Sequence, residues 1–285
     1  MPTFPYRELK PSQEALAVYT KWLTCLNDEF TRAQSVDRRS EIVRNELHQI
    51  FTGRPHGNRP RPNLNCELSS TVFADSLDPR NATLEPEYYG DCDHSLYAIR
   101  KPLIFFWQMF DRSPLGINHW LGFRVRAMLG KHIFKHIGQG VKIFHNVEFT
   151  FGYNLTIEDN CTIHKNVMLD DRGELILHHG TSISDYANVY THTHDINHQA
   201  DVTNKTTELG PRARITYHAT VLAGSSIGTD AMLGAMAIAT HPVPDATVAV
   251  GIPAKVKLHK QPGSTTTAES SPCSVAPDPA PSTVS

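Results

Sequence analysis

The sequence has little that would assign it to several common classes of protein. Its five cysteines form no Cys-x-x-Cys pair, so neither a disulfide framework nor a cysteine zinc site is indicated. Lys and Arg number 27 against 29 Asp and Glu, and this lack of a basic surplus argues against nucleic-acid binding. No apolar stretch approaches the roughly 20 residues of a membrane-spanning helix, and the first residues lack the apolar core of a secretory signal. We therefore expect a soluble, cytoplasmic protein with reduced thiols.

The composition is that of a folded chain. Of its 285 residues, 40% are hydrophobic and 20% are charged, which excludes wholesale disorder and suffices for one large domain or two modest ones. We divide it into an N-terminal helical region and wrap (1–102), an apolar helical segment (103–136), a repeat domain (137–262) and a tail (263–285).

The N-terminal region has two kinds of pattern. Apolar residues at three- and four-residue steps predict two helices within residues 12–52, the first beginning at Ser12. Residues 53–93 are rich in Pro, Gly, Asn and Asp and form either a long ordered wrap or a mobile loop. At the other end of the chain, the Ser/Thr/Pro/Ala-rich residues 263–285 predict a disordered tail.

The apolar helical segment allows two interpretations. Its aromatic and aliphatic residues are punctuated by cations such as Arg124 and Lys131. A pair of helices that packs on a larger core explains this pattern. A helix lying on a membrane surface, with weak contact through residues 103–129, also explains it, because cations flank an aromatic-rich face.

A six-residue period dominates the repeat domain. Aliphatic or aromatic residues recur every six positions, with a two-residue offset and one longer break, at Ile137, Ile143, Phe149, Ile157, Ile163, Leu169, Leu177, Ile183, Val189, Leu209, Ile215, Val221, Ile227, Leu233 and Ala239. Four residues after most of these stands a small or modest side chain. Neither an α-helix nor an ordinary strand has this period, which is typical of a parallel β-helix. Each hexad then forms one short strand and a corner, and three hexads complete a coil that buries its apolar face by stacking on its neighbours.

The longest break in the repeat, residues 191–208, contains the candidate chemistry. It is polar and carries His192, His194 and His198. These residues could bind a metal ion, one of them could act as a general base tuned by Asp195 or Asp201, or they could be solvent-exposed loop histidines. The residue types alone leave all three interpretations open.

Residues 113–258 resemble the hexapeptide-repeat acyltransferases, especially the maltose, galactoside and nodulation-type O-acetyltransferases and the exopolysaccharide (colanic-acid type) acetyltransferases. Residues 190–195 (YTHTHD) are similar to the loop that carries the catalytic histidine of that family. Residues 250–256 (VGIPAKV) are similar to its closing motif, and residues 113–130 to the segment before the repeats in the exopolysaccharide group. The resemblance implies a mainly β fold, a left-handed parallel β-helix of hexapeptide repeats.

The resemblance also implies a reaction. His194 would be the general base that takes a proton from a sugar or glycan hydroxyl, whose oxygen attacks the thioester carbonyl of acetyl-CoA directly. The backbone N–H of Tyr217 would stabilise the oxyanion. No metal is expected. The family forms homotrimers with active sites between neighbouring subunits, and we expect the same here.

Further site residues follow from the same resemblance. Asn166 and Asp171 would bind the acceptor, with Asp170 competing for the role of Asp171. The cofactor-binding residues would be Gly234, Ala235, Thr240, His241 and Lys255. Close packing at a corner is an equal explanation for Gly234 and Ala235. His241 and the Arg-Ile-Thr at residues 214–216 depart from the residues common in the family, which puts the details of the cofactor contacts in question.

Two alternatives remain at this stage. One is a γ-type carbonic anhydrase, which uses the same β-helix with three histidines on zinc. It is disfavoured because those ligands come from successive coils, whereas the three histidines here crowd one loop. The other is a non-catalytic β-helix scaffold with the N-terminal region as its docking element. The small-molecule or glycan acceptor is not identified by the sequence.

Overall fold

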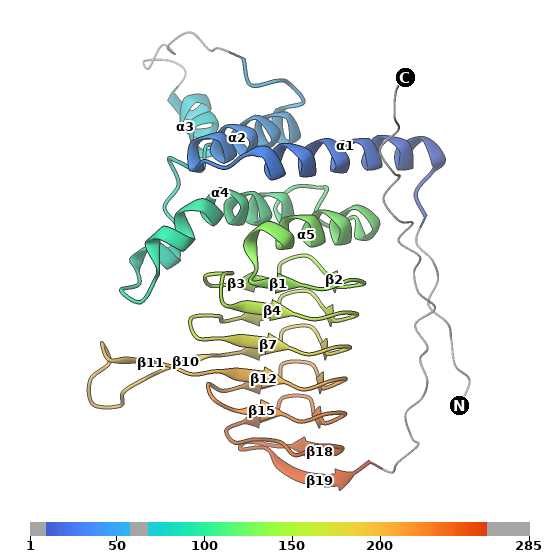
Figure 1. The fold of residues 1–285 in the computed structure, drawn as a ribbon, viewed down its shortest axis with the longest axis vertical. Helices are drawn as coiled ribbons and strands as arrows, with labels where there is room; N and C mark the ends of the chain where they lie inside the picture. The colour runs from blue at the N-terminus through green and yellow to red at the C-terminus, as the bar shows by residue number, and fades with distance from the viewer. Residues whose placement is uncertain (1–9, 58–67, 261–285) are drawn as a thin grey trace.

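The structure, a computed structural model, describes residues 10–57 and 68–260. Helices stand in two layers on one end of a parallel β-helix, with α1, α2 and α3 outside and α4 and α5 against the first coil (Figure 1). The prediction of a mainly β fold of hexapeptide repeats preceded by helices is confirmed. The predicted tail, residues 263–285, lies outside the described residues.

Short polar side chains begin the helices. Ser12 caps α1 by accepting a hydrogen bond from the Ala15 N–H, and Asp93 caps α4 through the N–H groups of Ser95 and Leu96. The two helices expected in residues 12–52 are α1 and α2. The helices are α1 (Gln13–Arg32), α2 (Val36–Thr52), α3 (Leu68–Ser76), the 3₁₀ turn η1 (Glu85–Tyr88), α4 (His94–Asp111) and α5 (His119–Ile133).

The described part of residues 53–93 contains helix α3 and the 3₁₀ turn η1. Helix α3 was not expected from the sequence. We call residues 77–93 the wrap; it includes η1 and leads into α4. Lys101 on α4 holds it by an ion pair of 2.8 Å to Glu87.

Most apolar residues of α4 and α5 face the interior, which favours the interpretation of residues 103–129 as a pair of helices packed on a larger core over that of a helix on a membrane surface. Residues 103–107 of α4 are all buried, and the indole N–H of Trp107 donates to the Val147 carbonyl of the first coil at 3.1 Å. Within the described residues, no helix is long and apolar enough to cross a membrane.

A buried arginine joins α5 to the first coil. Arg126 is 1% exposed and forms an ion pair with Asp111 at the end of α4. Its guanidinium also donates to the carbonyl oxygens of Gly116 and Ile143. Each of the three guanidinium nitrogens therefore has an acceptor, which compensates for burying this charge.

Three parallel sheets form the faces of the β-helix. Sheet A contains β1 (His136–Ile137), β4 (Leu155–Ile157), β7 (Leu175–Leu177), β12 (Thr207–Leu209) and β15 (Ser226–Ile227). Sheet B contains β2 (Lys142–Ile143), β5 (Thr162–Ile163), β8 (Ser182–Ile183), β13 (Arg214–Ile215), β16 (Met232–Leu233), β18 (Thr247–Val250) and β19 (Lys255–His259), the last one antiparallel. Sheet C contains β3 (Glu148–Phe149), β6 (Met168–Leu169), β9 (Asn188–Val189), β14 (Thr220–Val221) and β17 (Ile238–Ala239).

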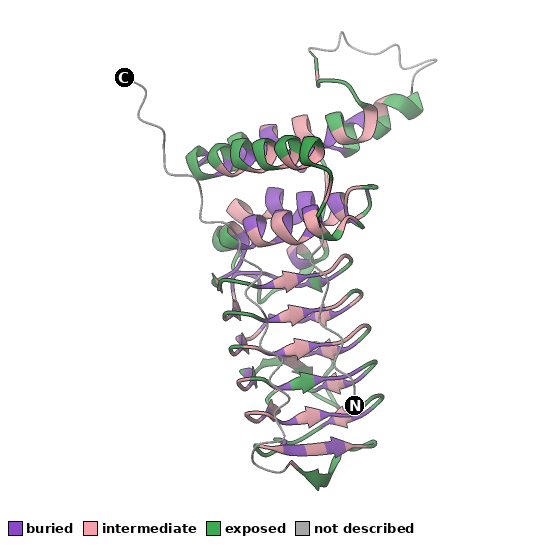
Figure 2. Ribbon diagram, turned by 90° about the vertical axis from the view of Figure 1, so that its right-hand side faces the viewer, coloured by how far each residue is buried: buried purple, intermediate pink, exposed green. Residues whose placement is uncertain are grey.

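The hexad pattern is the packing pattern of the coils. Except for the half-buried Ile137, the large residue of each hexad is buried, and so is the small residue four positions after most of them. Figure 2 shows these buried residues recurring from coil to coil. Stacked strands pair in register, as Leu209 with Ile227 and Ile215 with Leu233. Several corners contain residues with positive φ, such as Asn146, Asn160 and Asn166, and Asn tolerates this backbone conformation better than most residues.

The extra residues of the repeat collect on one edge. We call the corner where the chain leaves sheet C for sheet A the C–A edge, and the corner between sheets B and C the B–C edge. Ile227 follows its partner Leu209 by 18 positions, whereas Leu209 follows Leu177 by 32. The added residues form an antiparallel hairpin, β10 (His192–His194) and β11 (Val202–Asn204), which projects from the C–A edge (Figure 1). Two shorter insertions, after β3 and after β6, lie on the same edge.

Candidate functional site

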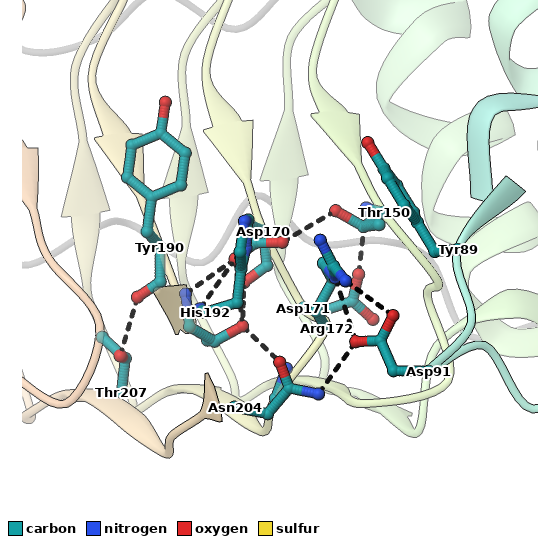
Figure 3. Close-up of polar contacts among 12 residues, drawn as sticks. Tyr89, Asp91, Thr150, Asp170, Asp171, Arg172, Tyr190, His192, Asn204 and Thr207 are labelled. Atoms are coloured by element: carbon teal, nitrogen blue, oxygen red, sulfur yellow. Dashed lines mark hydrogen bonds and ion pairs between the residues drawn. The ribbon is translucent and has the colours of Figure 1, made fainter. Parts of the chain in front are cut away.

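The candidate site is built from the three insertions on the C–A edge together with the wrap. Thr150 follows β3, Asp170 and Arg172 follow β6, and His192 begins the hairpin after β9. Figure 3 shows these side chains converging, with Asp91 reaching in from the wrap. Residues more than a hundred positions apart in the sequence are therefore neighbours here.

Asp170 and His192 form a dyad in which the carboxylate is buried and the imidazole is partly exposed. The Nδ1 atom of His192 lies 2.7 Å from Oδ2 of Asp170, whose side chain is 1% exposed. The hydroxyl of Thr150 and the N–H of Thr191 also donate to this carboxylate, at 3.0 and 2.8 Å. Because a carboxylate accepts hydrogen bonds, Nδ1 carries the proton and Nε2 carries the lone pair.

His194 lies two residues further along β10, on the exposed part of the hairpin. Its Nδ1 atom lies 2.6 Å from the backbone oxygen of Gln199, an acceptor, so the proton is on Nδ1 and Nε2 has the lone pair. The rings of His192 and His194 have their centroids 5.3 Å apart at 81°. His198 lies at the exposed hairpin tip, where its N–H donates to Asp195.

Asp171 occupies a different environment from the one expected of an acceptor ligand. Its side chain is fully buried, and its oxygens accept hydrogen bonds from the N–H groups of Thr150, Phe151 and Asn154 at 2.7–3.2 Å. Burial raises the pKa of Asp171 to about 7 against the opposing effect of these bonds. A carboxylate so enclosed cannot reach an acceptor, so we assign Asp171 a structural role at the turn after β3. Asp170, the competing candidate, holds His192.

Arg172 connects the loop after β6 to the wrap, and Asp91 connects the wrap to the hairpin. Its guanidinium forms a bidentate ion pair with Asp91, at 2.6 and 3.0 Å, and lies 4.3 Å from the ring centroid of Tyr89. The Asn204 amide of β11 donates to the same carboxylate at 2.9 Å. Burial alone would raise the pKa of Asp91, but the bonds from Arg172 and Asn204 hold it below its ordinary value. Asp91 is therefore a charged link between the helical region and β11.

An open cleft of about 510 Å³ lies between the wrap and sheet C. Thr83–Pro86 and Tyr89 of the wrap line one side, and Met168, Tyr190 and His192 are among the residues lining the other. His192 lines this cleft, whereas His194 does not.

The remaining predicted site residues divide between two edges of sheet C. Asn166, Tyr217, Gly234 and Ala235 are at corners of the B–C edge, and His194, Thr240 and His241 are on the C–A edge. Within one chain, sheet C therefore separates Tyr217 from His194. The backbone N–H of Tyr217 donates no hydrogen bond within the described residues, and its side chain is 57% exposed.

The expected cofactor residues are exposed except Gly234. A Cβ on Gly234 would lie 2.6 Å from Cγ1 of Val250, so close corner packing accounts for the glycine. Ala235, Thr240, His241 and Lys255 are all exposed, and the hydroxyl of Thr240 lies 2.8 Å from Nδ1 of His241. Lys255 begins β19 at the far end of sheet B.

No metal centre is formed in the described ranges, residues 10–57 and 68–260. They contain no group of three or more His, Cys, Asp or Glu side chains able to hold a metal ion. His192 and His194 have their Nδ1 atoms engaged by Asp170 and Gln199, and no third ligand faces them.

Sequence reasoning named His192 and Asp170 as candidates but missed their pairing, and it missed Arg172, Asp91 and Tyr89. A signal for Asp170 and Arg172 was present, because both lie in the two-residue offset between Leu169 and Leu177. Asp91 and Tyr89 gave none, since the contact joins segments far apart in the chain.

Known proteins similar to this chain share its fold and its repeat. A scan of protein-family models gives no match. The galactoside O-acetyltransferase of Escherichia coli (strain K12) is 26% identical over 144 residues, which are 50% of this chain and 62% of that protein. The chain is similar in sequence to this O-acetyltransferase and has the hexapeptide-repeat fold.

Solved structures of two acetyltransferases superpose on the β-helix. A maltose O-acetyltransferase from Clostridium difficile 630 aligns with a TM-score of 0.53 at 19% identity, over 63% of this chain and 99% of that one. A galactoside acetyltransferase in complex with coenzyme A aligns with a TM-score of 0.54 at 20% identity, over 61% of this chain and 86% of that one. At these identities the structures establish the shared left-handed β-helix. The match to the chain spans 62% of the length of the galactoside O-acetyltransferase, and helices α1–α3 and the wrap lie upstream of the repeats.

Proposed function

We propose that the protein is an acetyl-CoA-dependent O-acetyltransferase that transfers an acetyl group to a hydroxyl of a sugar or glycan. The observation that carries this proposal is the hairpin histidine: His194 projects from the β-helix with its Nδ1 bonded to a carbonyl and its Nε2 free to accept a proton. The sequence relative, a galactoside O-acetyltransferase, supports the acetyl donor and the sugar class.

In this reaction His194 acts as the general base. Nε2 takes the proton of the acceptor hydroxyl while the hydroxyl oxygen attacks the thioester carbonyl of acetyl-CoA. The tetrahedral intermediate collapses with cleavage of the C–S bond, and the imidazolium returns its proton to the leaving thiolate. The products are the O-acetylated acceptor and free coenzyme A. The Gln199 carbonyl supports the step because it keeps the ring in the tautomer that presents the lone pair and stabilises the imidazolium.

The separation of Tyr217 from His194 favours a site shared between subunits. Both residues are exposed, but sheet C lies between them in one chain. In a homotrimer of parallel prisms, the hairpin of one subunit would face the B–C edge of the next. The Tyr217 N–H, which has no acceptor in the described residues, would then stabilise the oxyanion beside His194.

The same arrangement gives the cofactor a path along the B–C edge. Tyr217, Gly234 and Ala235 lie on consecutive corners, joined by the hydrogen bond from the Met236 N–H to the Tyr217 oxygen at 3.0 Å. Lys255 would bind the phosphates as a point charge, with Thr240 and His241 of the adjoining edge near the nucleotide. Asn166, on this B–C edge, would contact the acceptor.

Calorimetric titration with acetyl-CoA, combined with light scattering, tests the proposal. We expect binding at one site per subunit in the micromolar range, and a mass of three subunits. A screen of sugars by coenzyme A release then identifies acceptors. A monomer that binds no acetyl-CoA contradicts the proposal.

A further inference from the structure

The cleft beneath the wrap leads to the hairpin histidines and has no role in the chemistry described so far. Its floor is the outer face of sheet C, and its wall is the segment of the wrap around η1. Of the hairpin histidines, only His192 lines it. A molecule in the cleft would therefore contact His192 before it reached His194, whose ring centroid is 5.3 Å away.

Hydrogen bonds through Asp170 fix the orientation of the His192 ring. Its Nδ1 is bonded to Asp170, and that carboxylate also accepts hydrogen bonds from Thr150, Thr191 and the backbone N–H of His192, so the carboxylate that holds the ring is itself fixed from two neighbouring coils. The His192 side chain is 20% exposed, which leaves Nε2 accessible from the cleft. A buried carboxylate that orients an imidazole fixes both its tautomer and its direction.

The lining of the cleft fits a sugar ring. In Figure 3 the rings of Tyr89 and Tyr190 stand on either side of Asp170, so apolar ring faces and polar groups alternate along the site. The phenol of Tyr89 donates to Glu85, a bond that raises its pKa to about 12 and keeps it protonated. Aromatic faces pack on the C–H groups of a sugar ring, while carboxylates and imidazole bind its hydroxyls.

The charges of the cleft oppose an anionic ligand. Glu85, Glu148 and Asp170 contribute carboxylates. Two of the cations near it are already neutralised, Arg172 by Asp91 and Arg126 by Asp111. Arg112 is the remaining arginine among the lining residues. The balance favours an uncharged sugar over a sugar phosphate or a uronic acid.

We propose that this cleft is the acceptor site and that His192, held by Asp170, is a positioning residue that binds an acceptor hydroxyl next to the one that His194 deprotonates. The inference rests on the proposed function for the identity of the reaction. It assigns to the N-terminal helical region, through the wrap, one wall of the acceptor site.

Two variants of the dyad test the inference, each with a matched control on another edge. His192→Gln removes the imidazole, and Asp170→Asn removes the carboxylate that fixes its tautomer. The controls are His178→Gln and Glu158→Gln, because His178 Nδ1 lies 3.0 Å from Glu158 in an equivalent pair on the edge between sheets A and B. Thermal unfolding of each variant reports whether it folds.

The first readout is steady-state kinetics with the best neutral acceptor of the sugar screen. Both dyad variants should raise the acceptor KM at least tenfold, with kcat within about threefold and the acetyl-CoA KM unchanged, and neither control should do so. A change in the acetyl-CoA KM of the same size, or no change in the acceptor KM, overturns the inference. A loss of kcat in His192→Gln larger than that in His194→Ala also overturns it, because His192 would then be the base.

The second readout is binding without reaction. Saturation-transfer NMR with methyl β-galactopyranoside and methyl glucoside should show contact with the wild-type protein in the absence of acetyl-CoA, weakened by His192→Gln and by Tyr89→Ala. Methyl glucuronide should show none. Absence of any sugar contact overturns the inference, whereas sugar contact without acetyl transfer overturns the proposed function and leaves the cleft as a sugar site.

Discussion

The helical region and the β-helix bury their side chains in different ways. The β-helix repeats one solution, in which an aliphatic residue of each hexad points inward and a small one fits the corner, so Ile215 and Leu233 occupy equivalent places. The helical region has no repeat: Phe30 packs on Phe106, Trp107 packs on Phe149 of the first coil, and Arg126 is buried with Asp111. The regular region supplies a rigid frame, and the irregular one supplies contacts that occur once. The candidate site lies where the two meet.

The largest expected effect concerns the hairpin, where the regular frame is interrupted. His194→Ala should lower kcat by roughly 10²–10⁴-fold, the usual contribution of a general base, with little change in the unfolding temperature. His198→Ala, at the tip of the same hairpin, should have little effect because its side chain has no part in the proposed reaction. Coenzyme A release under saturating substrates measures both. Equal losses in the two variants would mean that the hairpin fold, rather than an imidazole, is responsible.

The next effect contrasts the two kinds of core. Arg126→Met leaves Asp111 buried without its cation and should lower the free energy of unfolding by about 3–5 kcal/mol. Burial already raises the pKa of Asp111 despite Arg126, so the unpaired carboxylate will be protonated more readily. Ile215→Val, in the regular core, should cost about 0.5–1.5 kcal/mol. Urea unfolding measures both, and the double variant Arg126→Met/Asp111→Asn should recover part of the loss. Equal losses of unfolding free energy in Arg126→Met and Ile215→Val would contradict the difference between the two cores.

The junction of the two regions should show a smaller effect, on activity rather than stability. Asp91→Asn removes the charge that links Arg172 and Asn204, so the hairpin loses its tie to the wrap. We expect activity to fall on the order of tenfold, within the range of a coupling of 0.5–2 kcal/mol. Asp230→Asn breaks the comparable but exposed pair with Arg212 and is the control. Similar activity of the two variants would show that the wrap does not position the hairpin.

The smallest expected effect concerns the pH dependence of stability, to which Asp171 of the β-helix and His132 of α5 contribute in opposite directions. Burial raises the pKa of Asp171 to about 7. Between pH 4 and pH 7 the folded state therefore binds a proton at Asp171 that the unfolded state does not. Because of this extra proton, the contribution of Asp171 to the free energy of unfolding increases as the pH falls through that window. Burial lowers the pKa of His132 on α5, so the unfolded state binds the extra proton and stability is lost as the pH falls below 6.5.

Thermal unfolding between pH 8 and pH 5 separates these two contributions. Asp171→Asn should make the protein more sensitive to acid, and His132→Gln should make it less so, by a few degrees at about 2–4 °C per kcal/mol. The same direction of change in both variants would contradict the assignment of opposite shifts to the two regions.

The sequence could predict the β-helix because each hexad repeats the same requirement, so Ile163 and Ile183 carry the same information about the fold. It could also locate the candidate site, because the break at residues 191–208 interrupts that repeat. The helical region offered only local signals, such as Ser12 at the start of α1, and these cannot predict that Trp107 bonds to Val147. The contact of Asp91 with Arg172 spans 81 positions and follows from the path of the wrap, which no local pattern specifies. Asp171 was misjudged for a related reason: the sequence does not reveal that the turn after β3 closes over its carboxylate.

The most direct test of the central claim, direct acetyl transfer assisted by His194, is a mass-spectrometric balance of one reaction. The wild-type protein is incubated with acetyl-CoA, first alone and then with an acceptor sugar. The account predicts that the intact protein keeps its mass in acetyl-CoA alone, and that one acetylated sugar appears for each coenzyme A released once the sugar is added. An acetylated protein that forms and then disappears on addition of the sugar would contradict direct transfer.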